Sequence, residues 1–281
     1  MLILAGVFLF CGATVAVVQY QYHLSKKLYQ AASAEFTAAQ ALAENPTGEK
    51  KKEKNGIIEE KEQVYGELAP IKVDCQALQK VNPDVTGWIY CPDTVINYPV
   101  LHGVSNDTYL HHSYDRTYNA SGSIFVDERN NRGFIDPVNI LYGHHMASGA
   151  MFATLDYWQT PSYFDQHPTM WLLTPVQDFR VELYSCYDTS AYSETYLFPS
   201  YPGASVADYV GMAAANSYLP RYIEVDPYAR YIVMSTCAYV FEDARTVLHG
   251  KLVPLYSAGG KPIVWNTPDS MITEETGRTP P

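Results

Sequence analysis

A series of short runs rich in β-branched and aromatic residues fills the chain beyond about residue 64. Pro, Gly, Asn and Asp separate these runs, as is typical of strands that are joined by turns. Because strands this short bury a core only when many of them pair, the pattern predicts a mainly β fold, built as a barrel or a sandwich. In chain order the runs are TGWIYC, YPVLHG, GSIFVD, NILYGHH, FRVELYSCY, RYIVMSTC and TVLHGKLVPLY.

Helical patterning interrupts the β runs in a few places. It occurs in IKVDCQALQKVN before the first strand, in MFATLDYW after a pair of histidines, and in ASVADYVGMAAANSYL before the last two strands. We therefore expect a small number of helices to accompany the β core.

The size and charge of the chain narrow its possible functions. It has 281 residues, of which 47% are hydrophobic, and these are enough for one sizeable folded domain, which we place at residues 67–258. The formal net charge of -11 leaves no broad basic face, so we do not expect nucleic acid as a partner.

The cysteines show neither a CxxC pair nor the spacing to histidine that is typical of zinc sites, so we expect no metal. Cys75, Cys91, Cys186 and Cys237 lie outside the apolar N-terminus and could pair as disulfides in an extracellular domain. A domain of this size does not need such cross-links, and buried thiols are therefore the favoured interpretation.

The apolar run MLILAGVFLFCGATVAVV opens the chain and carries no charged side chain. Tyr20 and Tyr22 follow it and suit a membrane interface, so we predict a transmembrane signal anchor over residues 1–23. A cleaved signal peptide is the alternative, although a basic start and a clear cleavage site are missing. We predict a single-pass anchor with an extracellular catalytic domain, although Lys26 and Lys27 alone favour the opposite orientation.

Residues 24–66 are interpreted as a stalk that is helical at first and charged later. Its KKKEK run is interleaved with and followed by glutamates, which indicates a solvated spacer more than a lipid contact. Residues 259–281 are interpreted as a flexible C-terminal tail.

The stretch RYIVMSTCAYVFEDARTVLHGKL places a thiol and a guanidinium on two successive strands. The first strand ends at Cys237 and the second begins near Arg245, so pairing of the strands would bring the two side chains together. A cation beside a thiol favours the thiolate, and guanidinium donors can stabilise an oxyanion. Taken singly, each residue also has a structural explanation, as a core cysteine and as a solvated arginine.

Acyl transfer through a cysteine also needs a group that gives a proton to the leaving amine, and imidazole suits this task at neutral pH. NILYGHHM ends a strand at Gly143 and delivers His144 to the strand end. We choose His144, but the residues alone leave open a second pair, His111 and His112 in YLHHSYD.

In combination these motifs resemble the sortases, in which STC is followed by an Arg that opens the final strand and YGHH lies upstream. The stretch NPDVTGWIYCPDTVINYPVLHGVSNDTYLHHSYDRTYNASGSIFVDERN resembles the class B branch, where NPD, GWI, YPV and GSIF-D-RN recur in that order. The resemblance covers residues 70 to 256. It implies a mainly β fold, an eight-stranded sortase-type β-barrel with N-terminal helices and an extra helix before the Cys-bearing strand.

The same resemblance implies the site residues. The family's catalytic histidine directly follows a glycine, which selects His144 over His111 and His112. The implied catalytic residues are His144, Cys237 and Arg245, and the implied substrate-binding residues are Asn106, Leu110, Tyr142, Ser235, Tyr196 and Leu197.

The resemblance implies a cysteine transpeptidase of the hydrolase class that needs no cofactor. Its partners would be the C-terminal sorting peptide of a surface protein, LPxTG-like or NPxTx-like, which is cleaved after Thr, and a peptidoglycan amine that accepts the acyl group. The alternatives are a pilin-polymerising sortase that uses a Lys nucleophile and a non-catalytic, membrane-anchored β-barrel binding module. A papain-like hydrolase is disfavoured because Cys237 lies late in the chain and on a strand.

Overall fold

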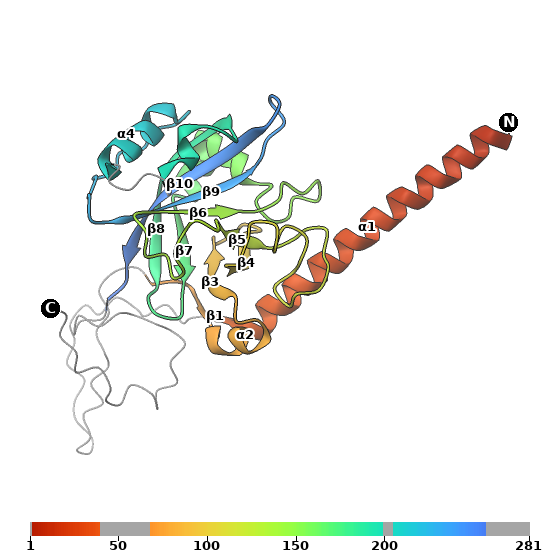
Figure 1. Ribbon diagram of the computed structural model, residues 1–281, viewed down its shortest axis with the longest axis horizontal. Helices are drawn as coiled ribbons and strands as arrows, with labels where there is room; N and C mark the ends of the chain where they lie inside the picture. The colour runs from red at the N-terminus through yellow and green to blue at the C-terminus, as the bar shows by residue number, and fades with distance from the viewer. Residues whose placement is uncertain (1, 40–67, 199–204, 257–281) are drawn as a thin grey trace, which may run out of the picture.

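A closed β-barrel forms the body of the protein in the computed structural model, which describes residues 2–39, 68–198 and 205–256 (Figure 1). Its eight strands follow one another around the barrel in the order β10-β8-β7-β3-β4-β5-β6-β9. The predicted eight-stranded, mainly β architecture is therefore confirmed. The strands are β3 (Val85–Tyr90), β4 (Asn97–Leu101), β5 (Ile124–Val126), β6 (Val138–Tyr142), β7 (Thr169–Leu173), β8 (Phe179–Ser190), β9 (Arg230–Cys237) and β10 (Ala244–Pro254).

Two contacts in the barrel are parallel, between β4 and β5 and between β6 and β9, and the others are antiparallel. The parallel pairing matters most at β9, because it sets this late strand beside β6, which lies far away in the sequence. β10 flanks β9 on its other side. The C-terminal end of β9 is thus bordered by two different segments of the chain.

The strand β9 is buried along nearly its whole length because both of its faces are covered. One face packs inside the barrel, where Ile232 and Met234 join the main hydrophobic core. The other face packs under the helix α4 (Val206–Asn216), which Ser205 caps by accepting a hydrogen bond from the Asp208 N–H. The predicted extra helix before the Cys-bearing strand is therefore confirmed.

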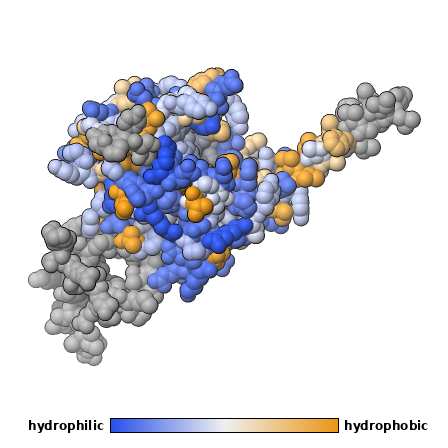
Figure 2. Space-filling model, viewed as in Figure 1, coloured by the Kyte–Doolittle hydropathy of each residue, from blue (hydrophilic) through white to orange (hydrophobic). Residues whose placement is uncertain are grey.

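A long helix, α1 (Leu2–Phe36), runs from the N-terminus to the barrel (Figure 1). Its second half packs on the barrel through the buried side chains of Tyr29, Ala32 and Phe36. Figure 2 shows several hydrophobic residues on the section of α1 next to the barrel, whereas the visible face of the barrel is mostly hydrophilic.

The single-pass N-terminal membrane anchor predicted over residues 1–23 is wrong. No helix within the described ranges combines the length and the apolar character that crossing a bilayer requires. The physical reason is that the apolar run ends at Val18 and α1 continues with Gln19, Gln21 and His23, whereas a span needs about 20 consecutive apolar residues.

The shorter elements differ from the predicted helices at two points. β1 (Thr37–Ala39) pairs with β2 (Ile71–Val73), so the helix expected from residue 71 begins only after Asp74, whose carboxylate caps α2 (Cys75–Val81). MFATLDYW forms no α-helix but leads into a short 3₁₀ turn. The remaining elements are η1 (Leu155–Gln159), α3 (Pro161–Gln166) and η2 (Glu194–Tyr196).

The charged part of the stalk and the C-terminal tail lie outside the described residues. The boundaries of the stalk, the folded domain and the tail therefore stay predictions.

Candidate active site

Cys237 ends β9 at the point where β6 and β10 flank it on either side. The antiparallel register of β10 sets Arg245 directly opposite Cys237, and side chains that face each other in this way have Cβ atoms about 4.5–5.5 Å apart. On the other side, Tyr142 of β6 pairs with Ser235. The Gly143 N–H, one residue before His144, donates to the Ser235 carbonyl at 3.1 Å. The barrel thus places Arg245 opposite Cys237 and brings the segment that carries His144 to the same strand end.

Two backbone contacts hold His144 in place. Its Nε2 lies 2.7 Å from the Leu110 carbonyl oxygen, and its own carbonyl accepts a hydrogen bond from the Phe152 N–H at 3.1 Å. A carbonyl only accepts, so Nε2 carries the proton, and Nδ1 is the free acceptor of the neutral ring. This arrangement leaves Nδ1 to exchange a proton with a reacting group.

The second histidine pair borders the same site. The ring of His111 stacks on that of His144, with centroids 5.8 Å apart and an interplanar angle of 22°. His112 turns away, and its Nδ1 lies 3.0 Å from the Thr108 carbonyl oxygen. The residues alone had left His111 open as an alternative to His144. In the structure the two rings are neighbours.

Arg245 is half-buried and faces a cavity of about 370 Å³. One of its nitrogens, Nη1, donates to the neighbouring Ala244 carbonyl at 2.9 Å, which steers the guanidinium along the strand end. Its remaining donors can reach a group in the cavity. The cavity is lined by Arg129, Tyr142, Ala191, Tyr192, Ser193, Tyr196, Leu197 and Arg245.

Three of the predicted substrate-binding residues form one cluster beside this cavity. The hydroxyls of Tyr196 and Ser235 are 2.8 Å apart, and the rings of Tyr142 and Tyr196 stack with centroids 6.3 Å apart. Burial raises the pKa of the Tyr196 phenol, so the hydroxyl keeps its proton. The cluster therefore offers a neutral, aromatic wall next to Arg245.

An ion pair between the buried Asp127 and the exposed Arg129 supports this wall, and sequence reasoning gave it no role. The Tyr142 hydroxyl donates to Asp127 Oδ2 at 2.7 Å, while Arg129 Nη2 donates to the same oxygen at 2.7 Å and its Nη1 donates to the Tyr196 carbonyl at 3.0 Å. Burial alone would raise the pKa of the Asp127 carboxyl, but the hydrogen bonds from Arg129 and Tyr142 outweigh it and lower that pKa. The motif GSIFVDERN contained both residues, and its buried strand followed by charges was the available signal.

The other predicted groove residues take no part in the hydrogen bond and the ring stacking of this cluster. Leu197 lines the cavity with 39% of its surface exposed. Leu110 contributes the carbonyl that holds His144. The Asn106 side chain accepts from the Glu128 N–H at 2.9 Å, and Asn106 does not line the cavity.

Cys237 differs from the core cysteines in its accessibility. It is partly exposed, whereas Cys91 and Cys186 are buried. Burial raises the pKa of the Cys91 thiol to about 12 and raises that of Cys186 as well, which leaves both thiols protonated and unreactive. No group of three His, Cys, Asp or Glu side chains within the described ranges is arranged to hold a metal ion.

Comparisons with known proteins agree with this geometry. No family model matches the chain. The sortase B of Listeria monocytogenes is 31% identical over 255 residues, which cover 90% of this chain and 94% of that protein. A crystal structure of Bacillus anthracis sortase B in complex with AAEK1 superposes with a TM-score of 0.65 at 26% identity, covering 84% of this chain and 99% of the other.

A sortase B–substrate complex of Staphylococcus aureus superposes with a TM-score of 0.59 at 26% identity, covering 64% of this chain and 84% of the other. Since this family consists of cysteine transpeptidases, the alternative of a non-catalytic binding module is excluded. The chain belongs to the class B sortases and is a cysteine transpeptidase.

Proposed function

We propose that this transpeptidase cleaves a C-terminal sorting motif of surface proteins after Thr and transfers the shortened protein to a cell-wall amine. The observation that supports the proposal is the register of β9, in which Cys237 pairs with Arg245 of β10 and Ser235 pairs with Tyr142 of β6, two residues before His144. A thiol, a proton carrier and a planar cation are the groups that acyl transfer through cysteine requires.

In the first step His144 Nδ1 takes the proton of the Cys237 thiol, and the resulting thiolate attacks the Thr carbonyl carbon, whose π electrons move to oxygen. Arg245 stabilises this oxyanion with its guanidinium N–H groups. As the oxyanion collapses, the peptide C–N bond breaks, His144 gives its proton to the departing amine, and a thioester to Cys237 remains.

In the second step an amine attacks the thioester carbonyl. His144 takes the proton from this amine, the new amide forms, and the Cys237 thiolate leaves. A peptidoglycan amino group as the acceptor gives a product fixed to the cell wall, whereas the Lys side chain of a pilin would give a polymer.

The cavity beside Arg245 supports a place for the peptide, because its wall of Tyr142, Tyr196 and Leu197 offers apolar contacts with few charges. The Staphylococcus aureus neighbour was solved as a substrate complex, which favours a substrate on this chain too. Asn106, Leu110 and Ser235 extend the proposed groove.

Mass spectrometry of the enzyme with LPxTG-like and NPxTx-like peptides, each with a set of candidate amines, tests this function. We expect the acyl fragment ending in Thr on Cys237, followed by an amide to one amine class. Cys237→Ala should lower turnover at least about 10³-fold while the circular dichroism spectrum stays unchanged.

The matched control is Cys91→Ala, because Cys91 is a buried thiol without a place at the site. It should form the thioester as the wild type does. Normal turnover by Cys237→Ala would refute the assignment, and a product joined to a pilin Lys would replace the cell-wall acceptor by the pilin alternative.

A further inference from the structure

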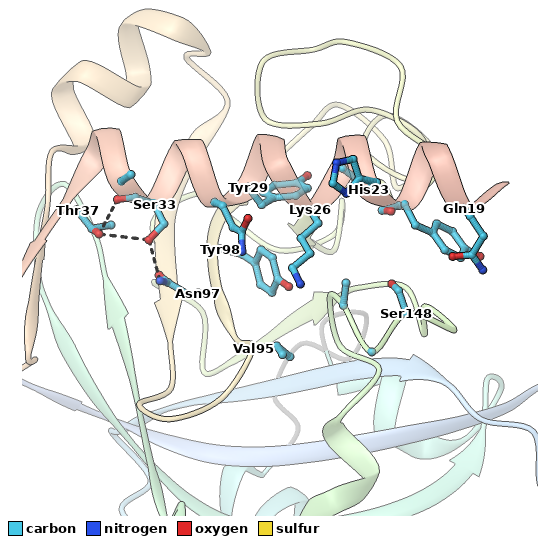
Figure 3. A pocket seen from close by; sticks show the side chains of 17 residues that line it. Gln19, His23, Lys26, Tyr29, Ser33, Thr37, Val95, Asn97, Tyr98 and Ser148 are labelled. Atoms are coloured by element: carbon cyan, nitrogen blue, oxygen red, sulfur yellow. Dashed lines mark hydrogen bonds between the residues drawn. The ribbon is translucent and has the colours of Figure 1, made fainter. Parts of the chain in front are cut away.

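A cavity of about 670 Å³ lies between α1 and the barrel, and Cys237 is not among the residues that line it (Figure 3). Tyr29 of α1 and Tyr98 of β4 meet in its wall, edge to face, with ring centroids 5.3 Å apart. The two side chains are only 5% and 7% exposed, respectively. The hydroxyl of Tyr29 contacts the backbone at Gly122, and the hydroxyl of Tyr98 contacts the backbone at Met151.

The Tyr29 hydroxyl holds the turn at Gly122 and Ser123. It donates to the Gly122 carbonyl and lies 3.1 Å from Ser123 Oγ. Gly122 has φ +54°, and a Cβ there would lie 2.5 Å from the Leu110 carbonyl oxygen, so this turn packs tightly against that carbonyl. Ser123 fixes the same loop by donating from its N–H to the Tyr109 carbonyl at 3.0 Å.

The Leu110 carbonyl is the group that receives the His144 Nε2 hydrogen bond at 2.7 Å. The contacts therefore form a continuous series from Tyr29 through Gly122 to Leu110 and the imidazole. One side of His144 is placed by the helix α1.

Tyr98 is linked to the His144 backbone by a second series of contacts. Its hydroxyl accepts a hydrogen bond from the Met151 N–H at 3.1 Å. Met151 has φ +58°. This conformation is unfavourable for any residue that has a Cβ, and it persists only where the surrounding structure enforces it. The next residue, Phe152, donates its N–H to the His144 carbonyl at 3.1 Å.

We propose that Tyr29 and Tyr98 are positioning residues for His144, which hold its imidazole and its backbone through two separate series of contacts and so couple the packing of α1 on the barrel to catalysis. This inference rests on the proposed role of His144. Burial raises the pKa of both phenols, so neither hydroxyl ionises and Tyr29 stays a donor at neutral pH.

The test is Tyr29→Phe, which removes one hydroxyl and keeps the ring that packs on Tyr98. A displacement of about 1 Å in a catalytic group can cost about 10²-fold in rate, and we expect Tyr29→Phe to lower kcat for peptide cleavage about tenfold with an unchanged KM. The pH profile of Cys237 alkylation by iodoacetamide should shift toward that of His144→Ala, which a loss of stability alone would not cause.

Tyr22→Phe is the matched control, because Tyr22 lines the same cavity from the same helix and its hydroxyl makes no hydrogen bond with the described residues. It should behave as the wild type. Tyr98→Phe gives a second measurement if Tyr29→Phe folds poorly, with the same expected loss of kcat.

The outcomes separate the two claims. If His144→Ala is inactive while Tyr29→Phe and Tyr98→Phe keep wild-type kcat and alkylation profiles, the positioning role is overturned and the proposed function stands. Wild-type turnover by His144→Ala would instead overturn the role of His144 itself.

Discussion

One hydrogen bond to the backbone orients the guanidinium of Arg245 and leaves its other N–H groups available to a substrate. Nη1 donates to the Ala244 carbonyl at 2.9 Å, so the plane of the group is set by β10 before any ligand binds. The remaining N–H groups are arranged as a rigid fork that matches a carbonyl oxygen or a carboxylate. A lysine in this place would carry the charge but would have no second point of attachment.

We therefore expect Arg245→Lys to lower kcat/KM for peptide cleavage by roughly 10²-fold, because loss of one preorganised oxyanion donor costs about 10²–10³-fold. The thioester yield by mass spectrometry measures the effect. Arg230→Lys is the control at the other end of the Cys-bearing strand, where Nη1 donates to the Phe134 carbonyl, and it should keep full activity. Equal rates for Arg245→Lys and the wild type would show that charge alone suffices.

Gly143, directly after β6, has no side chain, and the side chains of Ile124 and Phe152 fill the space beside it. A Cβ on Gly143 would lie 2.5 Å from Ile124 Cδ1 and 2.8 Å from the ring of Phe152. Phe152 also donates its N–H to the His144 carbonyl. Overcrowding at this point must therefore move either the strand end or the segment that supports His144.

Gly143→Ala should cost about 1–3 kcal/mol of unfolding free energy through overpacking and should reduce turnover beyond that loss, because His144 shifts. Urea denaturation and peptide cleavage measure the two effects. Gly211→Ala is the matched control: apart from the backbone of α4 itself, no atom lies within 4 Å of its added Cβ, and alanine should stabilise that helix by up to about 1 kcal/mol. Unchanged activity of Gly143→Ala would contradict the role of this packing.

Most barrel strands could be predicted from the sequence because β-branched runs bounded by turn residues mark them clearly. β7 could not, since its TMWLL run is buried along nearly its whole length and shows no alternation of polar and apolar residues. MFATLDYW has helical spacing, but its first residue, Met151, takes a positive φ, and Pro161 begins a separate helix. Tertiary contacts override local pattern at both places.

The candidate site was predictable where it depends on strand ends and not where it depends on loops. Cys237 and Arg245 follow from the alternation and spacing of two adjacent strands. The contacts of Tyr29 with Gly122 and of Leu110 with His144 join segments far apart in the chain. No local sequence pattern could therefore predict these contacts.

At the scale of the whole molecule, a second hydrophobic cluster lies between the outer face of the barrel and α4. His249 of β10 is fully buried in this region and stacks on Tyr187, with ring centroids 5.3 Å apart. Neither of its ring nitrogens has a hydrogen-bond partner within the described ranges. Burial therefore lowers the pKa of His249 to about 3.

This buried imidazole makes the fold sensitive to acid. A histidine in the unfolded chain has a pKa of about 6.5. Below that pH His249 is protonated in the unfolded chain, whereas in the native protein it stays neutral down to about pH 3. The stabilisation is complete above the unfolded pKa and falls by about 1.4 kcal/mol per pH unit as the pH decreases. Between pH 7.5 and 4.5 this one group should cost about 2–3 kcal/mol.

His249→Phe removes the proton-binding nitrogens and keeps a ring to stack on Tyr187, so its unfolding free energy should fall less between these pH values, by about 2–3 kcal/mol. Urea denaturation of both proteins at pH 7.5 and 4.5 measures the difference, in which the other titrating groups cancel. His23→Gln is the control, because His23 is exposed on α1 and should leave the pH dependence unchanged. Parallel stability curves for His249→Phe and the wild type would mean that His249 takes up its proton within the folded barrel.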